Sequence, residues 1–229
     1  MTRCYDLHIH SCLSPCAGDD MTPANIAGMA YIKGLSLIAL TDHNSGANLP
    51  AISEAAAAYG LILVPGMEVT TSEEVHVLTY FADVDTAVAF GEQLYGSLPG
   101  IQNRPDIFGN QLIMDTKDTV AGTLPKLLLQ AAPYTIDDVV RMAKERDGCA
   151  VPAHINRDSF SVLANLGFIP PNLFGCVEVA KNLPCPDLRG HYRIFHSSDA
   201  HELGAIAEPL ETLCGIESAG DFIDFVNNF

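Results

Sequence analysis

The stretch that decides the fold is Cys4-Tyr5-Asp6-Leu7-His8-Ile9-His10-Ser11, near the start of the chain. It reads as a β-strand, and side chains two residues apart on a strand share one face. His8 and His10 are therefore expected to point the same way. A helix should follow from Pro23 to about Lys33, because Thr22 is a typical N-cap and proline is favoured in the first turn.

From this strand onward, strand-like and helix-like segments alternate along the chain. Further strands are expected at residues 35–40, 61–64, 75–81, 149–154, 176–180, 194–198 and 212–216, with helices at 52–59, 86–94, 136–146 and from 219 onward. About seven strands interleaved with helices predict one α/β domain spanning 1–229, with a mostly parallel sheet that is open or closed into a barrel. Residues 97–133 break the rhythm and read as an insertion, with a hairpin near 111–120 and a short helix near Leu127.

The composition restricts the expected partners and location. The chain has 28 Asp and Glu against 12 Lys and Arg, a formal net charge of −16. This balance argues against a general nucleic-acid surface or a basic membrane patch, so we expect a small phosphorylated partner, not long nucleic acid or membrane. Seven cysteines without disulfide-framework spacing, no signal peptide and no apolar run of about 18 residues favour a reduced, cytoplasmic protein.

Histidine and acidic residues gather at the expected strand ends. They are His8, His10, His43, Glu68, His76, His154, Asp199 and His201, with Asp42 beside His43. In a barrel of βα units, C-terminal strand ends converge on one mouth. Any one histidine could be an ordinary core residue, but so many imidazoles and carboxylates packed together would need protons or divalent metals. His76 begins its strand instead of ending it, so it requires a local reversal of chain direction.

These motifs, taken in order, resemble those of the PHP (polymerase and histidinol phosphatase) family of metal-dependent phosphoesterases. The matching segments are His8-Ile9-His10, Thr41-Asp42-His43, Glu68, His76, Pro152-Ala153-His154 and Ser198-Asp199-Ala200-His201. The resemblance implies a distorted, TIM-barrel-like (βα)7 barrel with two to three divalent ions of Zn, Mn or Fe. It implies hydrolysis of a phosphate ester, either a phosphomonoester such as histidinol phosphate or a nucleotide, or a short phosphodiester.

The resemblance also implies a set of metal ligands. His8, His10, Glu68 and Asp199 would hold a first ion; Glu68 would bridge to a second held by His76 and His154; His43 and His201 would hold a third. Asp42 would support the ligands from behind. Catalytic roles would fall to Asp199, His201 and His43, with a metal-bridging hydroxide as the nucleophile. Cys16 stands near the position where the family offers Asp or His, and is either a ligand or a loop thiol replaced by Asp19 or Asp20.

Other residues are assigned by position. Arg157 and Lys181 follow strand ends and are expected to bind phosphate, although either could be an ordinary surface charge. His191 and His196 have no evident partner and are taken as structural. Two alternatives remain open: an amidohydrolase-like enzyme acting on a C–N bond, which would use a metal-bridging lysine for which Lys181 is the candidate, and a metal-binding regulatory domain without catalysis.

Overall fold

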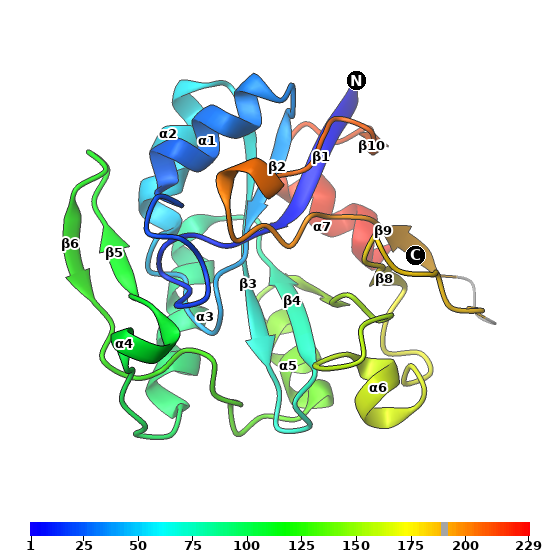
Figure 1. Cartoon of the computed structure of the whole chain (residues 1–229). Helices are drawn as coiled ribbons and strands as arrows, with labels where there is room; N and C mark the ends of the chain where they lie inside the picture. The colour runs from blue at the N-terminus through cyan, green and yellow to red at the C-terminus, as the bar shows by residue number, and fades with distance from the viewer. Residues whose placement is uncertain (189–191) are drawn as a thin grey trace.

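The computed structural model describes residues 1–188 and 192–229 and has seven α-helices among them. In chain order the elements are β1 (Thr2–Ile9), α1 (Pro23–Ile32), β2 (Leu37–Leu40), α2 (Leu49–Ala58), β3 (Ile62–Thr70), β4 (His76–Tyr80), α3 (Val84–Ser97), α4 (Pro105–Phe108), β5 (Leu112–Met114), β6 (Val120–Thr123), α5 (Ile136–Lys144), β7 (Cys149–Pro152), α6 (Val162–Leu166), β8 (Cys176–Glu178), β9 (Arg193–Phe195), the 3-10 helix η1 (Leu203–Ala205), β10 (Thr212–Cys214) and α7 (Ala219–Asn227). Figure 1 shows their arrangement. As predicted, Thr22 caps α1 by accepting a hydrogen bond from the Asn25 N–H.

The fold is mixed α/β and is built on a curled, six-stranded, half-barrel sheet. Its strand order is β10-β1-β2-β3-β4-β7. β1, β2 and β3 run parallel to one another, whereas β10 is antiparallel to β1, β4 to β3 and β7 to β4. The α/β class is confirmed, but a regular (βα)7 barrel is not. The expected strand at 212–216 is an antiparallel edge strand, and no helix separates β3 from β4.

β8 and β9 form a short parallel pair, with β8 next to β7 and with the chain after β9 next to the end of β1. Ile155, just after β7, donates its N–H to the Glu178 carbonyl of β8 at 2.9 Å. On the other side, His10 donates its N–H to the Ala200 carbonyl at 2.9 Å. These bonds bring the chain after β9 against the end of β1, so residues around 8–10 and 199–201 meet.

The reversal of direction at His76 is present as expected. β3 and β4 form an antiparallel hairpin in which Thr70 lies opposite His76. The beginning of β4 therefore lies at the same edge of the sheet as the end of β3. This turn lets a residue that opens a strand join residues that end the neighbouring strands.

The insertion contains the predicted hairpin, since β5 and β6 pair as antiparallel strands (Figure 1). The prediction of a helix near Leu127 is wrong. The chain there is extended, because Gln102 and Lys126 form an antiparallel bridge and Leu127 donates its N–H to the Ile101 carbonyl at 2.9 Å. The short helix of the insertion begins instead at Pro105, where proline is favoured in the first turn.

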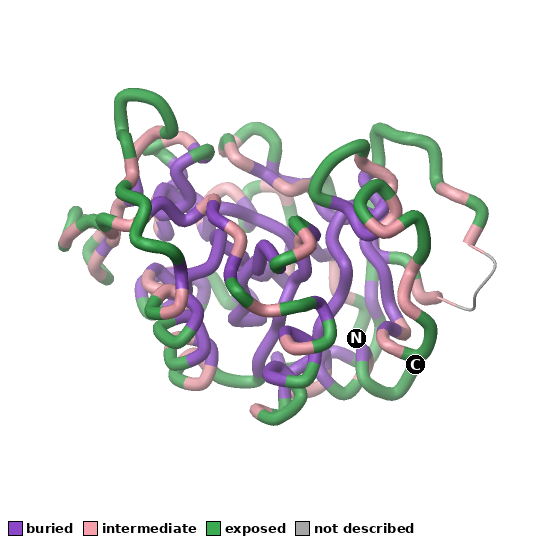
Figure 2. The backbone as a smooth tube through the Cα atoms, turned by 90° about the horizontal axis from the view of Figure 1, so that it is seen from below, coloured by how far each residue is buried: buried purple, intermediate pink, exposed green. Residues whose placement is uncertain are grey.

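Two groups of buried apolar side chains hold the sheet in place. One packs α1, α2, α3 and α5 on the sheet and includes Ile26, Ile38, Ile52 and Phe90; the other packs α7, with the Phe222 ring 5.3 Å from that of Tyr80. Figure 2 shows buried backbone running through the middle of the molecule and exposed residues mainly toward its outside. Among the described residues, no helix is long and apolar enough to cross a membrane.

Candidate metal centre

The Glu68 carboxylate is the centre of the site. It lies near the end of β3, and only 1% of the residue is exposed. Nitrogen atoms of five histidines surround its two oxygens. Oε1 lies 3.4 Å from His8 Nε2, 2.8 Å from His76 Nδ1 and 3.1 Å from His154 Nε2, while Oε2 lies 3.4 Å from His10 Nε2 and 3.1 Å from His43 Nδ1. Four separate segments of the chain therefore aim five rings at one carboxylate.

Asp199 adds a second carboxylate to this cluster. Its Oδ1 lies 3.2 Å from His8 Nε2, 3.1 Å from His10 Nε2 and 3.7 Å from His201 Nδ1. That oxygen is buried and has no hydrogen-bond partner of acceptable geometry among the described residues. The Asp199 backbone is in the left-handed region, with φ 52°, and His154 also has a positive φ of 28°. Such strained residues concentrate at functional sites, where the surrounding structure holds them.

The expected ligands fall into three groups, in each of which the ligand atoms lie within 4.8 Å of one another. The groups are His8, His10, Glu68 and Asp199; His43, Glu68 and His76; and His10, His43 and His201. The first matches the set expected for the first ion. The second contains His43 where His154 was expected, although His154 Nε2 lies 3.3 Å from His76 Nδ1. Glu68, His10 and His43 each belong to two groups.

This donor set fits divalent cations. His8 Nε2 and His10 Nε2 face each other at 3.0 Å, and two such nitrogens need a proton or a cation between them. Burial lowers the pKa of His10, but its contacts with Asp199 and Glu68 outweigh burial and raise that pKa to about 9. Burial, with His10 nearby, lowers the pKa of His201 to about 4. An ion binding here must displace the His10 proton, so its affinity should rise with pH.

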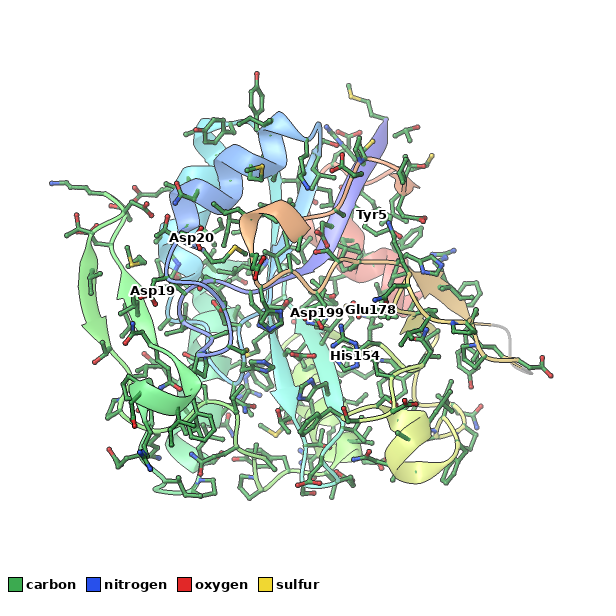
Figure 3. All side chains as sticks on the ribbon, viewed as in Figure 1. Tyr5, Asp19, Asp20, His154, Glu178 and Asp199 are labelled. Atoms are coloured by element: carbon green, nitrogen blue, oxygen red, sulfur yellow. The ribbon has the colours of Figure 1, made fainter. Side chains whose placement is uncertain are left out.

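Glu178 belongs to the site and was not predicted. In Figure 3 it lies beside His154 and Asp199 in the middle of the molecule. Its carboxylate accepts a hydrogen bond from His8 Nδ1 at 3.0 Å and one from the His154 backbone N–H at 3.1 Å. The first bond places the His8 proton on Nδ1 and directs Nε2 toward Glu68 and Asp199. A lone carboxylate within the apolar run Cys176–Ala180 was the sequence signal that could have revealed it.

Replacing Glu178 by glutamine should weaken metal binding about 10- to 100-fold. The amide has one oxygen in place of two, so its NH2 group would face one of the donors, His8 Nδ1–H or the His154 N–H. Titration of the metal-free protein with Zn or Mn would measure the change. Glu54→Gln, at an exposed position of α2, is the control and should bind ions as the unaltered protein does. Equal affinities for all three proteins would show that Glu178 does not position His8.

A second chain of hydrogen bonds joins His10 to Asp42, the residue that was expected to support the ligands. His10 Nδ1 lies 3.0 Å from Ser14 Oγ, which donates to Asp42 Oδ1 at 2.7 Å and accepts the His43 N–H at 3.2 Å. Asp42 also accepts the Ser11 N–H at 2.7 Å. Asp42 thus holds the loop after β1 against the loop after β2, and reaches His10 through Ser14.

The segment that carries Asp199 is held by a buried carboxylate of β1. Asp6 accepts hydrogen bonds from the Ser198 N–H at 3.0 Å, from the Ser198 hydroxyl and from the Ala207 N–H at 2.9 Å. Burial raises the pKa of Asp6, and these donors act in the opposite direction. Sequence inspection placed Asp6 in a strand without assigning it this role.

Cys16 is not brought into the cluster. It is exposed, and it belongs to none of the three ligand groups. The alternatives Asp19 and Asp20 are exposed as well, and Figure 3 shows them away from Asp199 and His154. Asp19 instead accepts hydrogen bonds from the Asn110 side chain at 2.9 and 3.1 Å. Desolvation of the sulfur, together with the carboxylates of Glu68, Asp199 and Asp42, raises the pKa of the Cys16 thiol to about 12, which favours a neutral thiol over a thiolate ligand.

Of the two histidines predicted to be structural, only His196 lies within the described residues. His196 Nδ1 donates to the Val179 carbonyl at 3.0 Å and lies outside the ligand groups, as expected. His191 lies outside the described residues.

A pocket of about 350 Å³ opens beside the cluster and contains the expected phosphate-binding residues. Arg157, Lys181 and Lys33 line it together with His154 and Asp199. Arg157 lies 2.6 Å from Asp199 Oδ2 and remains 39% exposed, whereas Lys33 is engaged by two carbonyls and Glu208. Lys181 Nζ lies 3.9 Å from Glu211. Lys181, the candidate metal-bridging lysine of the amidohydrolase alternative, is thus paired with a carboxylate outside the three ligand groups.

No protein-family model matches the chain. One curated relative, a 5′-3′ exoribonuclease of Haemophilus influenzae, is 35% identical over 74 residues, which cover 32% of this chain and 26% of that protein. The chain thus matches only about a quarter of that relative's length.

Three solved structures share the fold. Endonuclease Q bound to a 27-mer duplex with an abasic lesion has a TM-score of 0.61 at 19% identity, covering 89% of this chain and 50% of that chain. A protein of Bifidobacterium adolescentis described as a metal-dependent phosphoesterase has a TM-score of 0.61 at 19% identity, covering 96% and 94%. An amidohydrolase of Chromobacterium violaceum with bound sulfate has a TM-score of 0.61 at 22% identity, covering 92% and 91%. The chain shares the fold of these proteins, and a metal-dependent phosphoesterase is among them, in agreement with the resemblance that the motif order indicates.

These comparisons contradict the expected partner, a small phosphorylated molecule with long nucleic acid excluded. Endonuclease Q is bound to a DNA duplex, and the curated relative is an exoribonuclease. The expectation was wrong because net charge describes the whole surface, whereas a phosphate is bound by the few cations near it. Here Arg157, Lys181 and Lys33 line one pocket beside the cluster, although the chain has only 12 Lys and Arg.

Proposed function

We propose that this chain is a metal-dependent phosphoesterase that hydrolyses phosphodiester bonds of nucleic acid, with two or three ions of Zn, Mn or Fe as cofactors. The observation that carries the proposal is the convergence of five histidines and Asp199 on Glu68, beside a pocket that contains Arg157. Imidazole and carboxylate donors suit these three metals. Catalytic roles are assigned to Asp199, His201 and His43.

Bound ions would supply Lewis acidity toward the phosphoryl oxygens and lower the pKa of a coordinated water. The chain's own residues provide placement and charge. Glu178 and Asp42, the latter through Ser14, keep His8 and His10 turned toward Glu68. The Arg157 guanidinium lies at the pocket and pairs with Asp199. It could exchange this partner for a phosphate oxygen of the substrate.

The acidic surface limits how nucleic acid can bind. Few cations line the pocket, so only a few phosphates should be contacted. Each phosphate contact steepens the fall of binding affinity with salt concentration by a similar amount. We therefore expect a shallow salt dependence. The similarity to an exoribonuclease and to a DNA-bound endonuclease supports nucleic acid as the substrate class.

Replacing Arg157 by alanine should lower kcat/KM for an oligonucleotide about tenfold or more, because a hydrogen bond to a charged group contributes about 1.5–3 kcal/mol. Arg141→Ala is the matched control, since Arg141 is exposed on α5 and pairs with Asp138 and Glu145. Steady-state kinetics on labelled RNA and DNA would show the difference. Equal losses in the two variants would remove Arg157 from phosphate binding.

The function itself is tested with the full chain loaded with Zn or Mn. Single-stranded RNA and DNA oligonucleotides labelled at either end would be incubated with it, and the order of product appearance would show exonucleolytic or endonucleolytic cleavage. Asp199→Asn should abolish cleavage, and Glu54→Gln should not. Bound ions with no hydrolysis of any oligonucleotide, or of p-nitrophenyl phosphate, would refute the proposal and favour a non-catalytic metal-binding domain.

A further inference from the structure

A second pocket adjoins the metal centre and takes no part in the function proposed so far. It has a volume of about 350 Å³ and is lined by Thr70, Glu74, Pro99, Ile101, Gln130 and Phe160, among others. Two of these residues touch the strand end that carries His76. Thr70 lies opposite His76 in the β3–β4 pair, and the Phe160 ring stacks on the His76 ring. A ligand in this pocket would therefore lie near His76, one of the candidate metal ligands.

Phe160 presents a stacking surface. Its ring centroid is 4.8 Å from that of His76 with an interplanar angle of 22°, yet the residue is 43% exposed. The backbone holds this placement, because the Phe160 carbonyl accepts the His76 N–H at 2.9 Å. Phe160 also has a φ of 52°, which is costly for an aromatic residue. A large apolar ring kept partly exposed in a strained conformation beside a metal centre suggests contact with a ligand.

Two polar atoms at the pocket have no partner. Thr70 Oγ1 and Gln130 Oε1 are buried and make no hydrogen bond among the described residues. The orientation of the Gln130 amide is set, because Nε2 donates to the Leu127 carbonyl at 2.7 Å and to the Ile101 carbonyl at 3.2 Å. Oε1 is thus a fixed acceptor. Leaving a buried acceptor unpaired is destabilising, and each such group calls for an explanation such as a missing ligand.

The charge of the pocket excludes a phosphate. Neither Lys nor Arg is found among the described residues that line it, and Glu74 contributes a negative charge. Pro99 and Ile101 add apolar walls. A flat, neutral ring with hydrogen-bond donors on its edge matches these features. A nucleobase has this chemistry, and its face can stack on an aromatic side chain.

We propose that this pocket binds a base of the nucleic-acid substrate, with its face on Phe160 and its polar edge, which carries donors such as an exocyclic amino group, toward Gln130 and Thr70. The inference rests on the proposed function and adds a subsite to it. The segment between β7 and α6 then serves both parts of a nucleotide, since Arg157 lies at the phosphate-binding pocket and Phe160 at the base-binding pocket. Ser161 joins them by donating its hydroxyl to the Arg157 carbonyl at 2.7 Å.

The test uses the metal-loaded full chain and pairs of single-stranded oligonucleotides that differ only by a base-free sugar at one position. The unaltered protein should show a KM about tenfold lower for the base-containing strand when that position flanks the cleaved bond. Phe160→Leu, which keeps apolar bulk without the ring, should bring the ratio of the two KM values close to one. Phe160→Tyr should keep the tenfold ratio. Phe168→Leu is the matched control at another exposed phenylalanine and should also keep it.

Thr70→Val gives an independent check on the polar end of the pocket. The buried Thr70 hydroxyl has no partner, so its loss should not lower the thermal midpoint, while it should raise the KM several-fold for the base-containing strand only. Metal content of each variant would be measured alongside, because Phe160 touches His76.

A binding measurement separates this inference from the proposed function. An oligonucleotide containing 2-aminopurine should lose fluorescence on stacking with Phe160, and the chain has no Trp to interfere. Quenching that disappears in Phe160→Leu supports the subsite even if no strand is cleaved, in which case only the proposed function fails. Cleavage with equal KM for both strands, or quenching that persists in Phe160→Leu, would overturn the subsite and leave the phosphoesterase proposal intact.

Discussion

Replacing Glu68 by glutamine should reduce hydrolysis of a phosphodiester about 10³-fold, equivalent to about 4 kcal/mol of transition-state stabilisation. The carboxylate lies within 3.4 Å of nitrogens from five histidines and belongs to two of the three ligand groups. A glutamine of the same shape is neutral and turns an NH2 group toward some of these nitrogens. It would therefore weaken two ion sites at once, whereas loss of His201 affects one group.

The measurement combines metal content by elemental analysis with steady-state kinetics. Glu68→Gln should lose at least one ion per chain together with its activity, and Glu54→Gln, an exposed carboxylate on α2, should retain both. A Glu68→Gln protein with full metal content and unchanged kcat would contradict the role given to the central carboxylate. If Glu68→Gln keeps its full metal content but has a reduced kcat, Glu68 acts in the chemical step and is not needed to hold the ions.

Removing the ions with a chelator should lower the thermal midpoint by roughly 8–16 °C. Ligands that bind only the native state stabilise it by about 4 kcal/mol at a thousandfold excess over Kd, and a domain of this size loses roughly 2–4 °C per kcal/mol. The physical cause is the buried cluster itself. His8, His10 and Glu68 are at most 1% exposed, so their charges are separated from water and depend on one another or on bound cations.

Thermal unfolding would be followed with and without EDTA and again after Zn or Mn is restored. The restored protein should recover its midpoint. His10→Ala, which removes a residue shared by two ligand groups, should show a much smaller response to the chelator. A midpoint that EDTA does not change in the unaltered protein, when elemental analysis shows that ions were present and have been removed, would argue that the fold does not depend on them.

Most of the candidate site could be predicted because its residues occur at strand ends. His8, His10, Glu68, His76, His154 and Asp199 were expected to converge, and the structure brings them together. Period-2 geometry placed His8 and His10 on one face, and the reversal required at His76 is the β3–β4 hairpin. These inferences depend on local geometry, which a short stretch of chain determines.

Features that depend on distant segments could not be predicted. The role of Glu178 arises because β8 comes to lie against the end of β7 and faces His8, 170 residues away in sequence. Cys16 was a plausible ligand by position, but the structure places it in none of the three ligand groups. The partner was misjudged because a net charge cannot show that Arg157 and Lys181 line one pocket.

The sequence by itself determined the α/β class, the order of the motifs and the identity of most metal-binding candidates, because strand periodicity, helix capping and residue chemistry are local properties. Three features emerge only in the folded chain: the curl of the half-barrel, the carboxylate that supports His8, and the pocket lined by Thr70, Gln130 and a partly exposed Phe160. These depend on the close packing of segments far apart in the chain, and such packing has no counterpart in any single stretch of sequence.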